Sequence, residues 1–207
     1  MALQNRVTPW SELIATPERG MFMGNRGCLH DAQRQIVRPF RGKRWIICHL
    51  EFKGRHRQLM TPGQYTELFF LDEAAALAAG HRPCAECQRD RFNAFRDAFA
   101  AGNDLSGRVS ADDIDRLLHA QRCSSGSPTQ IDALPDGVMV EHDGAAFLVT
   151  AAAWRRWSPA GYGETVPWPQ GAPVRVLTPV ATVAALSAGY VPVLHESADR
   201  HVAGPPT

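Results

Sequence analysis

The chain has 207 residues, a net charge of +1, 44% hydrophobic residues and 21% charged residues, which is the ordinary balance of a soluble globular protein with one large or two small domains. No run approaches the roughly 18 apolar residues that a membrane-spanning helix needs. Residues 1–9 lack the continuous apolar region of a signal peptide, so we expect a cytoplasmic protein without membrane partners.

The first half of the chain predicts few regular elements. Residues 1–43 are expected to be mostly irregular, because glycines and prolines interrupt every period. Residues 44–52 are rich in β-forming side chains and predict a strand, and residues 55–60 predict its hairpin partner. A short strand is expected at 66–71.

Two helices are predicted next. Residues 73–79 are rich in alanine, with Asp72 suited to the N-cap and Gly80 to a left-handed stop. A longer helix is expected over 85–101. Its buried face is marked by a stripe of aromatic side chains with helical spacing, Phe92, Phe95 and Phe99. This stripe indicates packing in a core.

The remaining elements follow from capping and turn signals. Ser110 and Asp113 form a partial capping box that opens a third helix. A hairpin is predicted over 138–150 around an Asp-Gly turn. A Pro- and Gly-rich connection holds Trp154, Trp157 and Trp168. After it we expect a strand at 174–177 and then a helix with Thr178 as its cap.

The cysteines carry the main chemical signal. They stand at positions 28, 48, 84, 87 and 123. An odd number of thiols in a reducing compartment favours ligands or buried thiols over disulfides. Cys84 and Cys87 have the C-x-x-C spacing with which two thiolates bind one metal ion, and a helix follows them. A redox C-x-x-C would instead follow a strand of a βαβ unit, so the pattern predicts a metal site, with zinc as the cofactor.

Zinc prefers four ligands, so two more are expected upstream. Cys48 is our candidate for the third, because a buried apolar strand is a rigid place for a thiolate. His30, in a segment bounded by glycines, is the candidate for the fourth. Each has a plainer alternative: Cys48 as a core thiol and His30 as a structural or surface histidine.

Residues 69–87 contain an aromatic pair, a capped Ala-rich helix that ends in glycine, and Arg-Pro-Cys-x-x-Cys. This segment resembles the N-terminal metal-binding domain of the Ada methyl-phosphotriester repair regulator, over about residues 44–100. The resemblance implies a small α/β zinc domain that contacts the DNA backbone, with Cys84 and Cys87 as ligands and a role in repair or regulation. The family's upstream Cys-x-x-x-Cys pair is absent here, since Lys53 and Arg57 stand at the corresponding distance. Methyl acceptance is therefore not carried over.

A zinc enzyme is the alternative. His49 and Glu51, followed by Pro-Cys-x-x-Cys, match the zinc deaminase signature, in which His49, Cys84 and Cys87 would bind zinc and Glu51 would shuttle protons. The context disagrees with it, because a deaminase places its His-x-Glu at the start of a helix. A hydrolytic zinc enzyme belongs to the same class.

Charge is distributed unevenly along the chain. Residues 1–96 carry 15 basic and 9 acidic side chains, whereas residues 97–207 carry 7 and 12. A basic lobe attracts nucleic acid, and arginine suits bidentate phosphate contacts; a solvated surface is the plainer alternative. The candidate phosphate-binding residues are Arg26, Arg44, Lys53, Arg55, Arg57 and Arg82.

Together these observations predict an α+β protein. A basic zinc-binding module over 1–121, built from a β-hairpin and helices around the C-x-x-C turn, is followed by a linker at 122–137. A small region of mixed strands and a helix occupies 138–200, and a loose tail occupies 201–207. The expected function is zinc binding with contact to DNA or RNA phosphates. Whether the protein is also an enzyme stays open, as does its oligomeric state.

Overall fold

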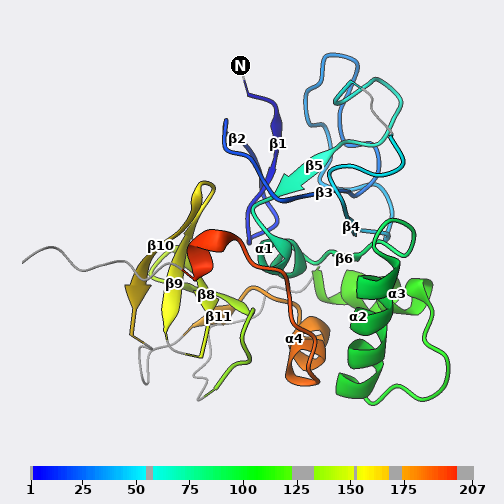
Figure 1. Ribbon diagram of the computed structural model, residues 1–207. Helices are drawn as coiled ribbons and strands as arrows, with labels where there is room; N and C mark the ends of the chain where they lie inside the picture. Colours follow the sequence, from blue (N-terminus) through cyan, green and yellow to red (C-terminus); the bar gives the residue numbers. More distant parts are fainter. Residues whose placement is uncertain (1, 55–57, 123–132, 152, 168–173, 200–207) are drawn as a thin grey trace, which may run out of the picture.

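The computed structural model describes residues 2–54, 58–122, 133–151, 153–167 and 174–199 (Figure 1). In these residues the chain forms two β-sheets and four α-helices, which confirms the predicted α+β class. None of the described helices has the length and apolar character needed to cross a membrane.

The first sheet is mixed, with strand order β2-β1-β5-β3-β4-β6. Its strands are β1 (Gln4–Val7), β2 (Leu13–Ala15), β3 (Phe22–Asn25), β4 (Ile46–Cys48), β5 (Leu68–Phe70) and β6 (Arg82–Pro83). The segment 1–43 is mostly irregular, as predicted, but the prediction missed the three short strands β1, β2 and β3 that lie in it. Gly24 explains the misreading: a Cβ there would lie 2.1 Å from the carbonyl oxygen of Ile46, so this glycine permits close strand approach rather than a break.

The predicted partner of β4 was also wrong. Residues 58–60, the described part of the expected strand at 55–60, do not form a strand. Instead β4 pairs antiparallel with β3 on one side and parallel with β6 on the other. Because it pairs on both edges, β4 lies inside the sheet, beside the segment that leads to Cys84. Both of its partners are distant in sequence.

The second sheet is antiparallel, with strand order β10-β9-β8-β7-β11. Its strands are β7 (Met139–His142), β8 (Ala145–Val149), β9 (Trp154–Ser158), β10 (Gly161–Val166) and β11 (Arg175–Val176). The predicted hairpin is confirmed, with Asp143 and Gly144 at φ values of 48° and 72°. The pairings correct the expected mixed strands. Trp154 and Trp157 lie in β9 rather than in a connection, and Trp168 lies outside the described residues.

The helices follow their capping signals closely. They are α1 (Glu73–Ala78), α2 (Arg89–Gly102), α3 (Ala111–Arg122) and α4 (Val180–Ser187), with a short 3-10 helix η1 (Glu196–Ala198). Asp72 accepts a hydrogen bond from the Ala75 amide at 2.9 Å, as predicted. Thr178 does not cap α4; its hydroxyl accepts from the Met139 amide, and Pro179 precedes the helix instead.

Helix α1 lies between the two sheets (Figure 1), and every residue of it is buried. Ala74, Ala75 and Ala78 pack with apolar side chains of the second sheet, whereas Leu77 joins the cluster around the first sheet and α2. Small side chains suit this position because they let elements on several sides approach the helix. The predicted stripe on α2 is buried in the core.

The main core contains residues from both sides of the expected linker. Val7 and Phe22 of the first sheet belong to the same buried cluster as Val140 and Phe147 of the second. Most of the linker, 123–132, lies outside the described residues, as does the expected tail. The division into two regions stays a prediction.

Candidate metal centre

Two parallel strands bring Cys48 and Cys84 together. In the β4–β6 register Ile46 pairs with Arg82 and Ile47 with Pro83, so the next residue of each strand is a cysteine. The amide of Cys84 donates to the carbonyl oxygen of Ile47 at 2.8 Å and continues this ladder. The two thiols therefore meet at the carboxyl ends of neighbouring strands.

A turn before α2 adds Cys87. The Gln88 amide donates to the Cys84 carbonyl oxygen at 3.1 Å, which closes the turn over the C-x-x-C spacing. The side-chain amide of Gln88, which is buried, also donates to the Ile47 carbonyl oxygen at 2.9 Å. The turn displaces the start of α2 to Arg89, later than the predicted 85. Gln88 was not anticipated; its place directly after Cys87 is the only sequence signal for it.

The sulfurs of Cys48, Cys84 and Cys87 lie within 4.8 Å of one another. In a tetrahedral zinc site with Zn–S distances of about 2.3 Å, neighbouring sulfurs are about 3.8 Å apart, so small movements close the group around an ion. Cys48 and Cys84 are buried and Cys87 is half-buried. The structure thus assembles the three cysteines that the sequence predicted as ligands.

Hydrogen bonds favour negative charge on one sulfur of the group, that of Cys84. The Glu86 amide donates to the Cys84 sulfur at 3.4 Å. Hydrogen bonds with the thiols of Cys48 and Cys87, and then backbone amides, lower the pKa of Cys84. Hydrogen bonds with Cys84 and Cys87, and then burial, raise the pKa of Cys48, and the pKa of Cys87 is raised as well. Three sulfurs this close cannot all ionise without a cation, since like charges oppose one another. A divalent metal would displace the remaining protons and satisfy all three.

A cavity of about 200 Å³ lies beside the cluster. Apolar and aromatic side chains form much of its wall, together with His49 and Glu86; these wall residues include Met23, Ile46, Leu50, Phe52 and Tyr65. The cavity gives the cysteine group a side that a small ligand can approach.

The structure does not bring His30 into this group, which corrects its expected role as the fourth ligand. Its Nδ1 lies 2.6 Å from the Thr66 hydroxyl, and its Nε2 lies 3.2 Å from the Thr61 carbonyl oxygen. Both ring nitrogens are therefore engaged in a buried polar network. Cys28 is also separate, with its thiol directed to the His30 carbonyl oxygen at 3.6 Å, and Cys123 lies outside the described residues.

The deaminase pattern is not assembled in its expected form. The sulfur of Cys48, and not the ring of His49, completes the group with Cys84 and Cys87. His49 and Glu51 are both exposed. His49 follows the last residue of β4 and contributes to the wall of the cavity beside the cluster, but it is not part of the group of converging ligand atoms. The backbone amide of His49 does take part, because it donates to the Cys87 sulfur.

Two of the candidate phosphate-binding residues are buried. Arg26 is 1% exposed and donates to the His81 ring and to the Ser11 carbonyl oxygen. Arg82 is 2% exposed and forms a two-pronged ion pair with Asp115, at 3.0 and 2.7 Å. Neither guanidinium can reach a phosphate on the surface, so both predictions were wrong. The sequence did not reveal these roles because their partners are distant in sequence.

The other candidates keep their surface position where they are described. Arg44 and Lys53 are exposed. Arg44 forms an ion pair of 3.3 Å with the exposed Asp112, and the ammonium of Lys53 lies 5.0 Å from the centre of the Phe52 ring. Arg55 and Arg57 lie outside the described residues.

Comparisons with known proteins add no identity to this site: no protein-family model, no curated protein and no solved structure matches the chain.

Proposed function

We propose that this protein binds one zinc ion through the thiolates of Cys48, Cys84 and Cys87. The convergence of the three sulfurs supports the proposal. Thiolates are soft ligands that select zinc, copper(I) or iron–sulfur clusters. Zinc suits a site formed at two strand ends and one turn, because it accepts tetrahedral sulfur ligands without redox chemistry.

Elemental analysis of the purified full chain tests this. We expect one zinc per chain, with iron and copper below stoichiometry. Cys48→Ser and Cys84→Ser should each lose the metal, because serine does not supply a soft thiolate at neutral pH. Cys28→Ser is the matched control, since its thiol lies outside the group, and should keep one zinc. Metal-free wild-type protein, or full zinc in Cys84→Ser, would contradict the assignment.

We further propose that the protein contacts nucleic-acid phosphates through an exposed basic segment at 38–44. Arg38, Arg41, Lys43 and Arg44 are all exposed there. The Arg44–Asp112 pair leaves both side chains about 70% exposed, with values of 69% and 72%, so the pair is screened and weak. The Ada-like interpretation, with its role in repair or regulation, stays a prediction beside this proposal.

Fluorescence anisotropy with labelled DNA and RNA at several salt concentrations tests this proposal. Substituting Arg38, Arg41 and Lys43 with alanine should weaken binding and reduce the log–log salt slope by about 0.9 for each phosphate of duplex DNA that is no longer neutralised. A triple alanine variant at the exposed Arg89, Arg108 and Arg116 is the charge-matched control. Equal effects of both variants would show that binding depends on overall charge and not on this segment, which would contradict the proposal.

A zinc enzyme is a second candidate, which the cavity beside the cluster favours. With three thiolate ligands, a fourth zinc position directed to this cavity would accept water or a substrate. X-ray absorption at the zinc edge separates the two roles. Four protein ligands favour a structural site, whereas three sulfurs with one light atom that added thiol or azide displaces favour an enzyme.

A further inference from the structure

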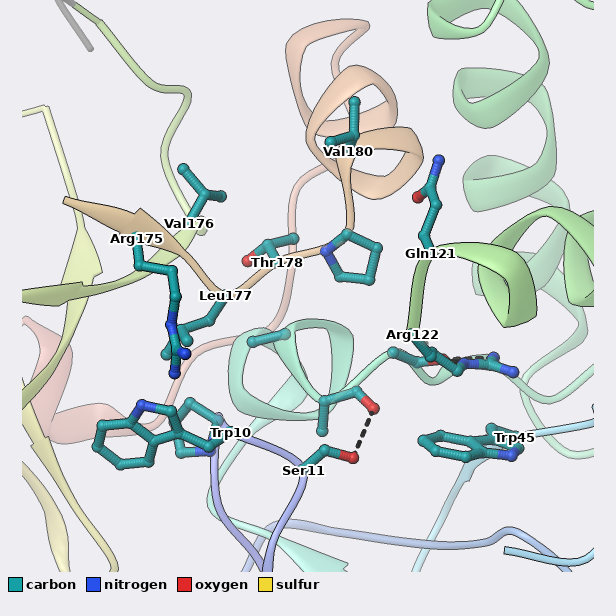
Figure 2. Close-up of a pocket in the computed structure, with 15 residues that line it drawn as sticks. Trp10, Ser11, Trp45, Gln121, Arg122, Arg175, Val176, Leu177, Thr178 and Val180 are labelled. Atoms are coloured by element: carbon teal, nitrogen blue, oxygen red, sulfur yellow. Dashed lines mark hydrogen bonds between the residues drawn. The ribbon is translucent and has the colours of Figure 1, made fainter. Parts of the chain in front are cut away.

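A second cavity, of about 240 Å³, lies where the two sheets meet (Figure 2). Trp10 and Ser11 come from the loop after β1, Trp45 lies directly before β4, and Arg122 is the last residue of α3. The segment from β11 to the start of α4 forms the remaining wall. We call this cavity the tryptophan pocket; it is distinct from the cavity beside the cysteines, with which it shares no lining residue.

One wall of the tryptophan pocket is strongly cationic. Trp45 has two guanidinium groups stacked against it, with the Cζ of Arg122 and that of Arg26 at 4.3 and 4.2 Å from its ring. In Figure 2, Arg122 lies over the Trp45 ring at the edge of the cavity. Two cations on one aromatic ring repel each other, although Arg122 also donates to the carbonyl oxygens of Gly80 and Lys43, at 2.8 Å each.

Arg26 shows that this charge is poorly compensated. It is 1% exposed, and its Nη2 has no hydrogen-bond partner within the part of the chain that the structure describes. Arg26 also forms no ion pair with a carboxylate among the described residues. Burial, followed by the charge of Arg122, lowers the pKa of Arg26 to about 9, so the group stays charged at neutral pH. Arg26 does not itself line the cavity, but its uncompensated charge lies against the Trp45 ring and adds positive potential to this wall.

The opposite wall offers a second cation next to a second indole. Trp10 donates its indole N–H to Glu141 at 2.6 Å, and Arg175 forms an ion pair with the same carboxylate. Figure 2 shows both side chains at the left of the cavity. The Nε of Arg175 has no partner among the described residues. None of the 15 described residues that line the cavity is acidic.

Helix α4 adds positive potential. It begins at Val180, above the cavity in Figure 2, so the positive end of its dipole lies at the cavity, although the amides of Thr182 and Val183 already donate to the Pro179 carbonyl oxygen. The side-chain oxygen of Gln121 accepts from the Ala181 amide at 3.0 Å and fixes this end of the helix against α3.

From these features we infer that the tryptophan pocket binds a small organic phosphate with a planar aromatic body, of the nucleoside monophosphate class. Arg122 and Arg175, the two guanidinium groups that line the cavity, would hold the phosphate, the latter through its unpartnered Nε, and the α4 dipole would add attraction. The indole of Trp10 would stack with the base, because the Trp45 ring is only 4% exposed and already carries two guanidinium groups. Neither interaction requires a metal, so the inference is independent of the cysteine site.

Calorimetric titration of the full chain with AMP and UMP tests the ligand class. Adenosine lacks the phosphate and ribose 5-phosphate lacks the base. We expect each to bind at least about fivefold more weakly than AMP, because each lacks one of the two interactions, the stacking of the base or the charge-assisted bonds to the phosphate. AMP that binds no more tightly than inorganic phosphate, or no more tightly than adenosine, would overturn the inference.

Two valines on the surface localise the site. Val180 lines the cavity and is 74% exposed, whereas Val191 is 75% exposed and does not line it. Val180→Asp places a negative charge at the mouth and should weaken AMP at least about fivefold by repulsion, without loss of folding, because a carboxylate suits the first turn of a helix. Val191→Asp carries the same charge and should leave AMP affinity unchanged within about twofold. Equal weakening by both variants, or none by Val180→Asp, would place the ligand elsewhere and overturn the assignment.

Discussion

His30 and Cys48 illustrate how hydrogen bonding decides which side chain is available to a metal. Cys48 is buried beside two other thiols, so its sulfur has no better partner than a cation that all three can share. His30 is equally buried, but the Thr66 hydroxyl and the Thr61 carbonyl oxygen occupy both of its nitrogens. A ligand role would require the loss of both bonds.

We therefore expect His30→Ala to reduce stability without loss of zinc. Removing the ring leaves buried polar groups unsatisfied, which costs about 1–3 kcal/mol in the free energy of unfolding. Urea unfolding and zinc content, measured on the same preparation, check this. His49→Ala is the control: its exposed ring should change stability by less than about 0.5 kcal/mol. Loss of zinc in either variant would restore that histidine as a ligand.

Arg82 has a structural role rather than a role in phosphate contact. Its ion pair with Asp115 joins β6 to α3 and is almost fully buried, with side-chain exposures of 2% and 4%. Breaking such a pair by removing one partner leaves an uncompensated buried charge, so Arg82→Met should lower the free energy of unfolding by about 3–5 kcal/mol. Denaturant titration measures this loss.

Two comparisons make the Arg82 result specific. Arg44→Met breaks the exposed pair with Asp112 and should cost less than about 1 kcal/mol. The double variant Arg82→Met, Asp115→Leu removes both charges, so it should be more stable than Arg82→Met alone. The single variant Asp115→Leu completes the comparison. If the double variant loses as much stability as the two single variants together, packing and not charge holds this contact.

Among the elements, α1 depends most on the size of its side chains. Ala75 is fully buried and packs against residues of the second sheet such as Met139 and Leu148. Its alanines would be typical of an exposed helix by propensity alone, but here they let two sheets and α2 come close. The helix therefore tolerates no increase in volume on its buried faces.

Ala75→Leu should lower the free energy of unfolding by at least about 1–3 kcal/mol through overpacking. Thermal and urea unfolding measure the change. Ala101→Leu is the matched control, since Ala101 is exposed on α2 and the same substitution there should alter stability by less than about 0.5 kcal/mol. Similar losses in both helices would contradict the packing of α1 between the sheets.

At the scale of the whole molecule, the proposed zinc ion connects three elements. It would tie the ends of β4 and β6 to the turn before α2, and would thereby connect the first sheet to helix α2 (Figure 1). A ligand that binds only the folded state stabilises it by mass action. The metal should therefore contribute to the stability of the fold as well as to the local site.

Zinc removal should make this visible. At free zinc one hundred times the dissociation constant, the folded state gains about 2.7 kcal/mol over the metal-free protein. Chelation should lower the melting temperature and speed amide hydrogen exchange in β4, β6 and the first turn of α2. The Cys48→Ser variant should show no dependence on zinc. An unchanged melting temperature in chelated wild-type protein would argue against the metal.

Features that depend on neighbouring residues could be predicted from the amino-acid sequence. The Asp72 cap, the Asp143-Gly144 turn and the C-x-x-C spacing act within a few positions, through turn geometry and bonds between side chains and the nearby backbone. The buried face of α2 was predictable for the same reason, because helical periodicity is local.

Contacts between groups that are distant in sequence could not be predicted and were revealed by the folded structure. Cys48 reaches the other thiols because β4 pairs with β6, and Arg26 is buried because it bonds to His81, 55 positions away. Glycines that look like breaks permit strands to approach, and the tryptophan pocket collects side chains from both sheets. Such contacts depend on which surfaces are buried together, and a local pattern holds no record of the partner surface.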